Sequence, residues 1–130
     1  MNKLMAIIDD DPAFQFITKR QLMHSGHKGA LLQFFDGQEA FDYFKQNESE
    51  ADHLPDLVLL DINMPYMDGW QFLDHLDLLN LAKENLIIYM VTSSNAKSDI
   101  QKAATYPRLA GYHIKPIAKE RMIEMLAALN

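Results

Sequence analysis

Short apolar runs alternate along the chain with longer segments in which apolar residues recur at helical spacing. The runs contain no Asp, Glu, Lys or Arg, which is typical of strands that are buried on both faces of a sheet. The segments between them are amphipathic, as helices that cover a sheet are. The pattern predicts strands at residues 4–8, 30–35, 57–60, 86–91 and 110–114, and helices that begin near residues 12, 37, 69, 96 and 117.

Three of the predicted helices begin at an acidic residue of the kind that caps helix N-termini. Asp11 precedes Pro12, which suits the first helical position, so we expect Asp11 to be a cap rather than a metal ligand. Asp36 is followed three residues later by Glu39, as in a capping box, and Asp68 opens the third helix. These caps support the boundaries that the apolar pattern indicates.

The amphipathic segments also predict which residues face the core. The fourth helix is weak and spans residues 96–105, where Pro107 should end it early, and the last helix spans residues 117–129. The first helix should end near Ser25 and point four apolar side chains inward, those of Phe14, Ile17, Leu22 and Met23.

Strand and helix alternate five times, so the chain predicts one α/β domain that covers residues 1–130. Helices should cover both faces of a parallel sheet in a doubly wound, flavodoxin-like (βα)5 arrangement, with strand order 2-1-3-4-5. In such a sheet, ligands bind beyond the carboxyl ends of the strands, between strands 1 and 3. The residues at those ends are therefore the candidates for function.

Acidic residues follow strands 1 and 3, at Asp9, Asp10 and Asp61. Two carboxylates about 4 Å apart repel each other by roughly 4 kcal/mol at an effective dielectric constant near 20, so this set needs a cation. Mg²⁺ fits best, because it accepts a few carboxylate oxygens and keeps waters, whereas Ca²⁺ prefers more protein oxygens and Zn²⁺ prefers His or Cys. The sequence thus predicts a magnesium site.

A hydroxyl residue, Thr92, and a cation, Lys115, follow strands 4 and 5. A carboxylate at a strand end can attack phosphorus and form an aspartyl-phosphate. A metal ion and an ammonium group would then offset the charge on the phosphoryl oxygens, to which Thr92 can donate a hydrogen bond. The strand ends therefore favour phosphoryl transfer to a carboxylate.

In order along the chain, these residues resemble the receiver domain of two-component response regulators. The resemblance rests on four short motifs and extends over essentially the whole chain. The four motifs are Asp9-Asp10 after the first strand; Asp61-Ile62-Asn63-Met64-Pro65, followed by Met67-Asp68-Gly69; Thr92-Ser93; and Gly111-Tyr112-His113-Ile114-Lys115-Pro116.

The resemblance implies a role for each matching residue. Asp61 would be the phosphoacceptor, and the Mg²⁺ ligands would be Asp10 directly, Asp9 mainly through water, Asp61, and the backbone carbonyl of Asn63. Thr92, Ser93 and Lys115 would bind the phosphoryl group, Tyr112 would be an aromatic switch that follows Thr92, and the Lys115–Pro116 peptide bond would be cis. Phosphorylation would then reshape the surface formed by helix 4, strand 5 and helix 5.

The implied partners are a sensor histidine kinase or a histidine phosphotransfer protein, and a downstream effector protein. One segment departs from the family pattern: residues 105–109 replace the small residues that usually precede strand 5. The output surface is therefore expected to differ from that of better-known relatives.

Composition narrows the function further. The chain has 18 acids, 12 bases and no cysteine, with a net charge of -6. This balance argues against binding to nucleic acid, and the absence of cysteine excludes disulfide frameworks and thiol catalysis. No apolar run approaches the roughly 18 residues of a membrane helix, so we expect a cytoplasmic protein with no membrane partner.

The leading hypothesis is a phosphorylation-dependent signalling switch without its own output domain, and three other functions are its alternatives. A Mg²⁺-dependent phosphohydrolase of the haloacid-dehalogenase type would usually carry a second Asp where this chain has Asn63, so an enzyme acting on an external substrate is disfavoured. A receiver scaffold that works without phosphate would usually lack one of the site residues. A phosphorelay intermediate or phosphate sink would look identical in sequence.

Overall fold

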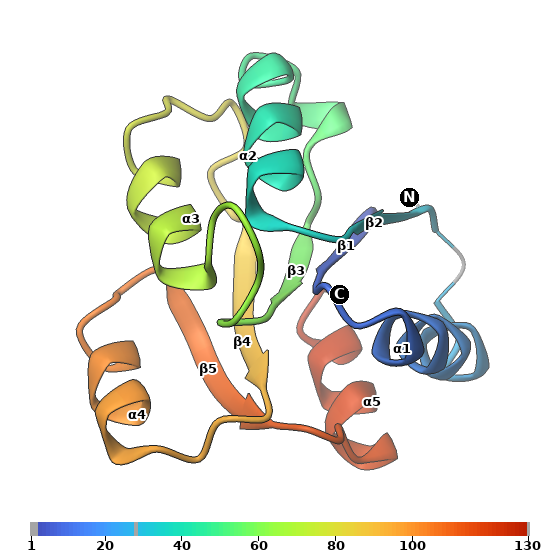
Figure 1. Ribbon diagram of the computed structural model, residues 1–130. Coiled ribbons are helices and arrows are strands. Elements are labelled where there is room, and N and C mark those ends of the chain that lie inside the picture. The colour runs from blue at the N-terminus through green and yellow to red at the C-terminus, as the bar shows by residue number, and fades with distance from the viewer. Residues whose placement is uncertain (1–2, 28, 130) are drawn as a thin grey trace.

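The computed structural model describes residues 3–27 and 29–129. Its centre is a five-stranded parallel sheet in the order β2-β1-β3-β4-β5, which confirms the expected topology (Figure 1). The strands are β1 (Met5–Ile8), β2 (Leu31–Phe34), β3 (Leu57–Leu60), β4 (Ile87–Thr92) and β5 (Leu109–Ile114).

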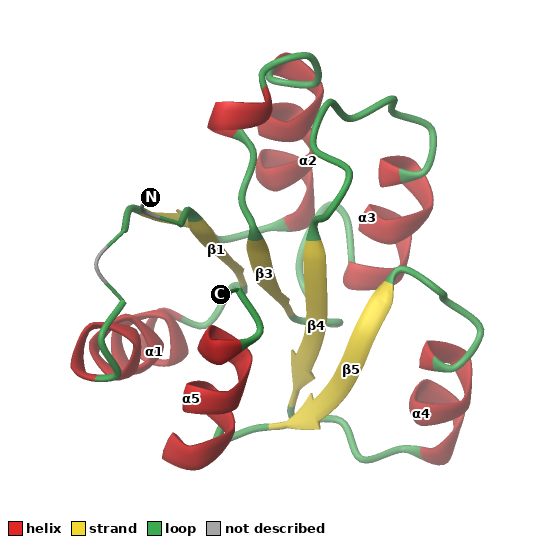
Figure 2. Ribbon diagram, turned by 180° about the vertical axis from the view of Figure 1, so that it is seen from behind, coloured by secondary structure: helices red, strands yellow, loops and turns green. Residues whose placement is uncertain are grey.

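Helices cover both faces of the sheet, as the alternating pattern predicts (Figures 1 and 2). The helices are α1 (Pro12–His24), α2 (Gly37–Gln46), α3 (Gly69–Leu76), α4 (Lys97–Ala103) and α5 (Lys119–Ala127), with a short 3₁₀ turn, η1 (Ala51–His53). Helices α1 and α5 lie on one face, and α2, α3 and α4 lie on the other. Of the described helices, none is long and apolar enough to cross a membrane.

Two apolar cores result from the alternation of side chains along the strands. In β1, Ala6 and Ile8 pack toward α2 and α3, while Met5 and Ile7 pack toward α1 and α5. All residues of β1 and β3 are buried, so these two strands form the rigid centre of the sheet. The loops that follow them are consequently well positioned to carry function.

The inward face of α1 differs from the prediction. Ile17 and Met23 are 57% and 61% exposed, so the expectation that they face the core is wrong. The buried residues of α1 are Gln15, Thr18 and Leu22, which share one face at a spacing of three and four residues. Leu22 is buried and Phe14 packs against the same core, as expected, so the apolar pattern was correct for these two residues and missed the two polar ones.

Helix α4 is shorter than predicted and ends at Ala103. Pro107 keeps the helix from continuing beyond residue 105, because Tyr106 before the proline avoids helical backbone angles, and residues 104–105 form a turn. The chain beyond the helix packs on α3: the ring of Tyr106 stacks on Trp70 at 5.2 Å, and the Tyr106 hydroxyl donates to Asp74 at 2.9 Å. Trp70, which is buried, is therefore a packing residue.

The predicted caps are present, with one difference in detail. Asp11 and Asp68 accept hydrogen bonds from backbone N–H groups of α1 and α3, and Asp68 forms a full capping box. Asp36 accepts from the N–H of Glu39, but the Glu39 carboxylate accepts from the N–H of Phe35 rather than completing the box.

Candidate functional site

The acidic residues meet at the carboxyl edge of the sheet because of the strand register. Ile8 pairs with Leu60 across β1 and β3, so the next residues, Asp9 and Asp61, leave the sheet side by side. The N–H of Asp61 donates to the carbonyl of Ile8 at 2.9 Å, which extends the ladder by one bond. The backbone positions of Asp9 and Asp61 are thus fixed by the two buried strands that precede them.

The Asp9, Asp10 and Asp61 carboxylates each contribute one oxygen to a cluster in which all three lie within 4.8 Å of one another. Asp9 and Asp61 are 1% and 6% exposed, while Asp10 is exposed to solvent. Burial, with a smaller contribution from the Asp61 charge, raises the pKa of the Asp9 carboxyl from 3.8 to about 6. The sheet edge therefore concentrates negative charge at some energetic cost.

Lys115 brings the opposing charge. Its ammonium nitrogen lies 2.7 Å from Asp9 Oδ2 and 3.6 Å from Asp61 Oδ2, and it also lies 4.3 Å from the centre of the Phe14 ring. Burial works to lower the pKa of Lys115, but the two carboxylates outweigh burial and raise that pKa. The Lys115–Pro116 peptide bond is cis, as the resemblance implies.

Thr92 and Tyr112 lie beside this cluster. Thr92 is fully buried at the end of β4, and its hydroxyl oxygen accepts from the N–H of Ser94 at 3.3 Å. The half-buried Tyr112 donates its hydroxyl proton to the Ser94 carbonyl at 2.8 Å. Ser93, between the two hydrogen-bonded residues, is exposed. The structure thus links Thr92 and Tyr112 through one residue, Ser94.

The loop between β3 and α3 packs tightly around Asp61. Asp61 Oδ1 accepts from the N–H of Ile62 at 2.8 Å, and the N–H of Gly69 donates to the carbonyl of Ile62 at 2.8 Å. A Cβ atom on Gly69 would lie 2.3 Å from the carbonyl oxygen of Asp61, so only glycine fits here. Asn63 lies in this loop, two residues after Asp61, and is exposed.

The donor set fits a hard divalent cation. All three carboxylates offer oxygen, and Asp9 Oδ2, although buried, has no hydrogen-bond partner among the described residues beyond its ion pair with Lys115. An acidic pocket with few protein oxygens suits Mg²⁺, which retains several waters. Asp10 adds an exposed carboxylate at the entrance, where an ion can arrive from solvent.

A family model, the response regulator receiver domain, matches residues 5–127. The chain belongs to this family. Receiver domains are signalling modules of two-component systems rather than enzymes in the classical sense, and they generally bind Mg²⁺ at the acidic pocket. They interact with histidine kinases and effectors.

Curated relatives and solved structures agree with this assignment. The chain is 26% identical over 117 residues to "Probable methanogenesis regulatory protein FilR2" of Methanothrix harundinacea, covering 90% of this chain and 74% of that protein. It is 31% identical to the response regulator MprA of a Mycobacterium species over 95% of this chain, but it spans only 48% of MprA. A response regulator receiver protein from Dyadobacter fermentans superposes with a TM-score of 0.81 at 25% identity, covering 97% of this chain and 96% of the other.

The sequence did not predict that two further side chains contact the residues of the acidic pocket. Phe14 was expected in the core, but its half-buried ring also lies against the Lys115 ammonium. Gln15 was not considered, yet it is 1% exposed and its amide donates to the backbone carbonyl of Asp9 at 3.1 Å. The signal that could have revealed Gln15 is its helical register, since it lies three residues before Thr18 and seven before Leu22.

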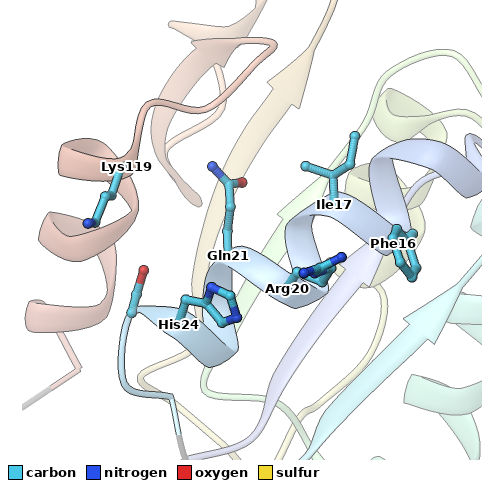
Figure 3. A pocket seen from close by; sticks show the side chains of 7 residues that line it. Phe16, Ile17, Arg20, Gln21, His24 and Lys119 are labelled. Atoms are coloured by element: carbon cyan, nitrogen blue, oxygen red, sulfur yellow. The ribbon is translucent and has the colours of Figure 1, made fainter.

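A separate groove lies between α1 and α5, away from the acidic pocket (Figure 3). Its volume is about 480 Å³, and none of its lining residues is a site residue. Phe16 and Ile17 are 60% and 57% exposed there. The lining residues are Phe16, Ile17, Arg20, Gln21, His24, Ser25 and Lys119.

Proposed function

We propose that this receiver domain accepts a phosphoryl group on Asp61 from a histidine kinase or a histidine phosphotransfer protein. The observation that carries the proposal is the convergence of the Asp9, Asp10 and Asp61 carboxylates within 4.8 Å, with the Lys115 ammonium beside them. A structural ion pair would need one acid for one cation. Three acids and one cation leave negative charge that a divalent ion offsets.

The transfer itself is a displacement at phosphorus. An Asp61 oxygen forms the new bond, the phosphorus–nitrogen bond to the donor histidine breaks, and the departing imidazole keeps the electron pair and takes up a proton. Mg²⁺ held by Asp9, Asp10, Asp61 and the Asn63 carbonyl would supply charge neutralisation to the phosphoryl oxygens. Because the acceptor oxygen belongs to Asp61, the product is the phosphorylated protein itself.

Three side chains are proposed to bind the oxygens of the phosphoryl group once it is on Asp61. The Lys115 ammonium, already 3.6 Å from Asp61 Oδ2, pairs with one phosphoryl oxygen. The Thr92 hydroxyl and the exposed Ser93 supply hydrogen bonds to another. As Thr92 turns toward phosphate, it gives up its contact with the Ser94 N–H, and Tyr112 is released from the Ser94 carbonyl.

This rearrangement would convert a local charge into a change of surface. Ser94 holds the start of α4, since its hydroxyl donates to Asp99 at 2.6 Å, and Tyr112 lies on β5. A shift of these two residues therefore moves the surface of α4, β5 and α5. We propose that a downstream effector protein reads that surface.

The exposed apolar face of α1 is the proposed docking surface for the phosphodonor protein. Helix α1 begins directly after the acidic pair, so a protein bound to Ile17 would have its histidine close to the site. We expect Ile17→Glu to slow transfer from a kinase about tenfold while leaving transfer from acetyl phosphate unchanged. Leu78→Glu is the matched control, because Leu78 is 80% exposed and follows α3 at the opposite edge of the sheet. Equal slowing in both variants would contradict this assignment.

The proposed function is tested by incubating the protein with acetyl phosphate and Mg²⁺ and measuring its intact mass. We expect one phosphoryl group to be added, and none in the presence of EDTA or in Asp61→Asn. Asp68→Asn is the control, since Asp68 is an acid near the same edge that serves only as a helix cap. Addition that survives in Asp61→Asn would refute the role of Asp61, and no addition from acetyl phosphate or a kinase would favour a scaffold.

A further inference from the structure

Gln15 is a buried polar side chain that the proposed phosphoryl chemistry does not use. It is 1% exposed on the sheet-facing side of α1, where a helix normally presents apolar residues. An amide in that position is unfavourable unless its hydrogen bonds are made. In the structure the Gln15 amide makes its hydrogen bonds, and the donors point to backbone carbonyls close to Asp9 and Asp10.

The Gln15 amide nitrogen reaches three backbone carbonyls at the end of the sheet. The distances are 2.8 Å to Phe34, 3.1 Å to Asp9 and 3.2 Å to Ile7. The amide oxygen of Gln15 in turn accepts from the side-chain amide of Gln33 at 3.0 Å. Gln33 therefore fixes which end of the Gln15 amide faces the carbonyls.

The contact with the Asp9 carbonyl bears directly on Asp10. The peptide unit is planar, so the carbonyl of Asp9 and the nitrogen and Cα of Asp10 move as one body. Holding that carbonyl sets the direction in which the Asp10 side chain leaves the loop. The rest of the turn is held by Asp9 itself, whose Oδ1 accepts from the N–H of Asp11 at 2.9 Å.

We propose that Gln15 is a positioning residue for the metal-binding acids. Through the Asp9–Asp10 peptide plane it holds the two carboxylates where they meet Asp61, and Gln33 orients it. This inference rests on the proposed function, because it assigns Gln15 a role toward the Mg²⁺ that the acids would hold. It also explains why a polar residue occupies the buried face of α1.

The test compares Gln15→Met, which keeps the side chain's length but removes the donor, with Asn47→Leu. Asn47 is a half-buried amide that donates to the Tyr43 carbonyl at 2.9 Å at the C-terminus of α2, far from the acids. Mg²⁺ affinity is measured by calorimetry and unfolding by urea titration in EDTA. We expect both variants to lose stability, but only Gln15→Met to bind Mg²⁺ about tenfold more weakly.

A kinetic readout separates positioning from general damage. If Gln15 positions the acids, the Gln15→Met variant needs more Mg²⁺ for half-maximal phosphorylation by acetyl phosphate, and its rate at saturating Mg²⁺ returns toward that of the parent. Gln33→Met removes the contacts of Gln33 with the amide oxygen and the backbone carbonyl of Gln15 but leaves the Gln15 donor in place, so the Mg²⁺ needed for half-maximal phosphorylation should rise less than in Gln15→Met. This milder variant keeps the test decisive if Gln15→Met fails to fold.

Two outcomes would overturn the inference in different ways. Mg²⁺ affinity within twofold of the parent in both glutamine variants would overturn the role of Gln15 and leave the proposed function standing. An unmodified protein that binds no Mg²⁺ and accepts no phosphoryl group would overturn the proposed function, and the inference with it. Equal loss of Mg²⁺ affinity in Asn47→Leu would show that the effect is loss of stability, which also overturns the inference.

Discussion

Replacing Asp9 with asparagine should stabilise the metal-free protein. Asp9 is 1% exposed and its pKa is raised from 3.8 to about 6, so the fold disfavours the ionised carboxylate even with Lys115 beside it. One pKa unit corresponds to about 1.4 kcal/mol, which makes the ionised side chain destabilising by about 2–3 kcal/mol at pH 7. Asparagine keeps an oxygen for the N–H of Asp11 and carries no charge.

The pH dependence follows from the direction of the shift. Between about pH 4 and pH 6 the folded protein binds more protons at Asp9 than the unfolded chain does, so the free energy of unfolding falls as pH rises through this window. The Asp9→Asn variant lacks this contribution. The difference in stability between variant and parent should therefore be small at pH 4 and reach its full value above pH 6.

Thermal and urea unfolding in EDTA at pH 7 measure the effect. We expect Asp9→Asn to raise the free energy of unfolding by about 2 kcal/mol and the Tm by about 6–10 °C. Asp52→Asn, which removes the same charge at an exposed position, should change stability by less than about 0.5 kcal/mol. Saturating Mg²⁺ should reduce the difference in the free energy of unfolding between Asp9→Asn and the parent, because the ion stabilises the parent more than the variant. An Asp9→Asn protein less stable than the parent in EDTA would refute the reasoning.

Two further predictions concern the first residue of α3 and a residue that packs on α3. Gly69→Ala should destabilise the protein by about 1–3 kcal/mol and slow phosphorylation by acetyl phosphate, because the new methyl group would displace the Asp61 carbonyl. An unchanged free energy of unfolding and an unchanged phosphorylation rate would contradict the tight packing of the loop around Asp61. Tyr106→Phe should lower the free energy of unfolding by about 1 kcal/mol through loss of its bond to Asp74, and a change in the fluorescence of Trp70, which stacks on Tyr106, would accompany any shift of the ring.

The sheet could be predicted from sequence because its strands are apolar on both faces. An uninterrupted run such as Leu57–Leu60 is typical of a strand that is buried on both faces, and the first three runs are each followed by a helix with an acidic cap. Strand order and the meeting of Asp9 with Asp61 then follow from the general rules of parallel sheets. The helix caps at Asp11 and Asp68 were equally predictable, since they depend on residues next to each other in the chain.

The face of α1 could not be predicted in the same way. Leu22 is buried as expected, but Gln15 and Thr18 are buried too while Ile17 and Met23 are exposed, so apolar residues alone place the buried face only in part. What decides the face is a polar requirement, the hydrogen bonds from the Gln15 amide to the backbone carbonyls of Ile7, Asp9 and Phe34. Those bonds join segments distant in sequence, so the sequence offers no more than the helical register of Gln15 with Thr18 and Leu22 as a signal.

The central claim is that Asp61 carries the phosphoryl group. The most direct test is to phosphorylate the protein with acetyl phosphate and Mg²⁺, reduce the acyl phosphate with borohydride, and map the modified peptide by mass spectrometry. Reduction converts a phosphorylated aspartate to homoserine, so the account predicts homoserine at position 61 alone. Homoserine at position 9 or 10, or at no position after confirmed exposure to a phosphodonor, would contradict it.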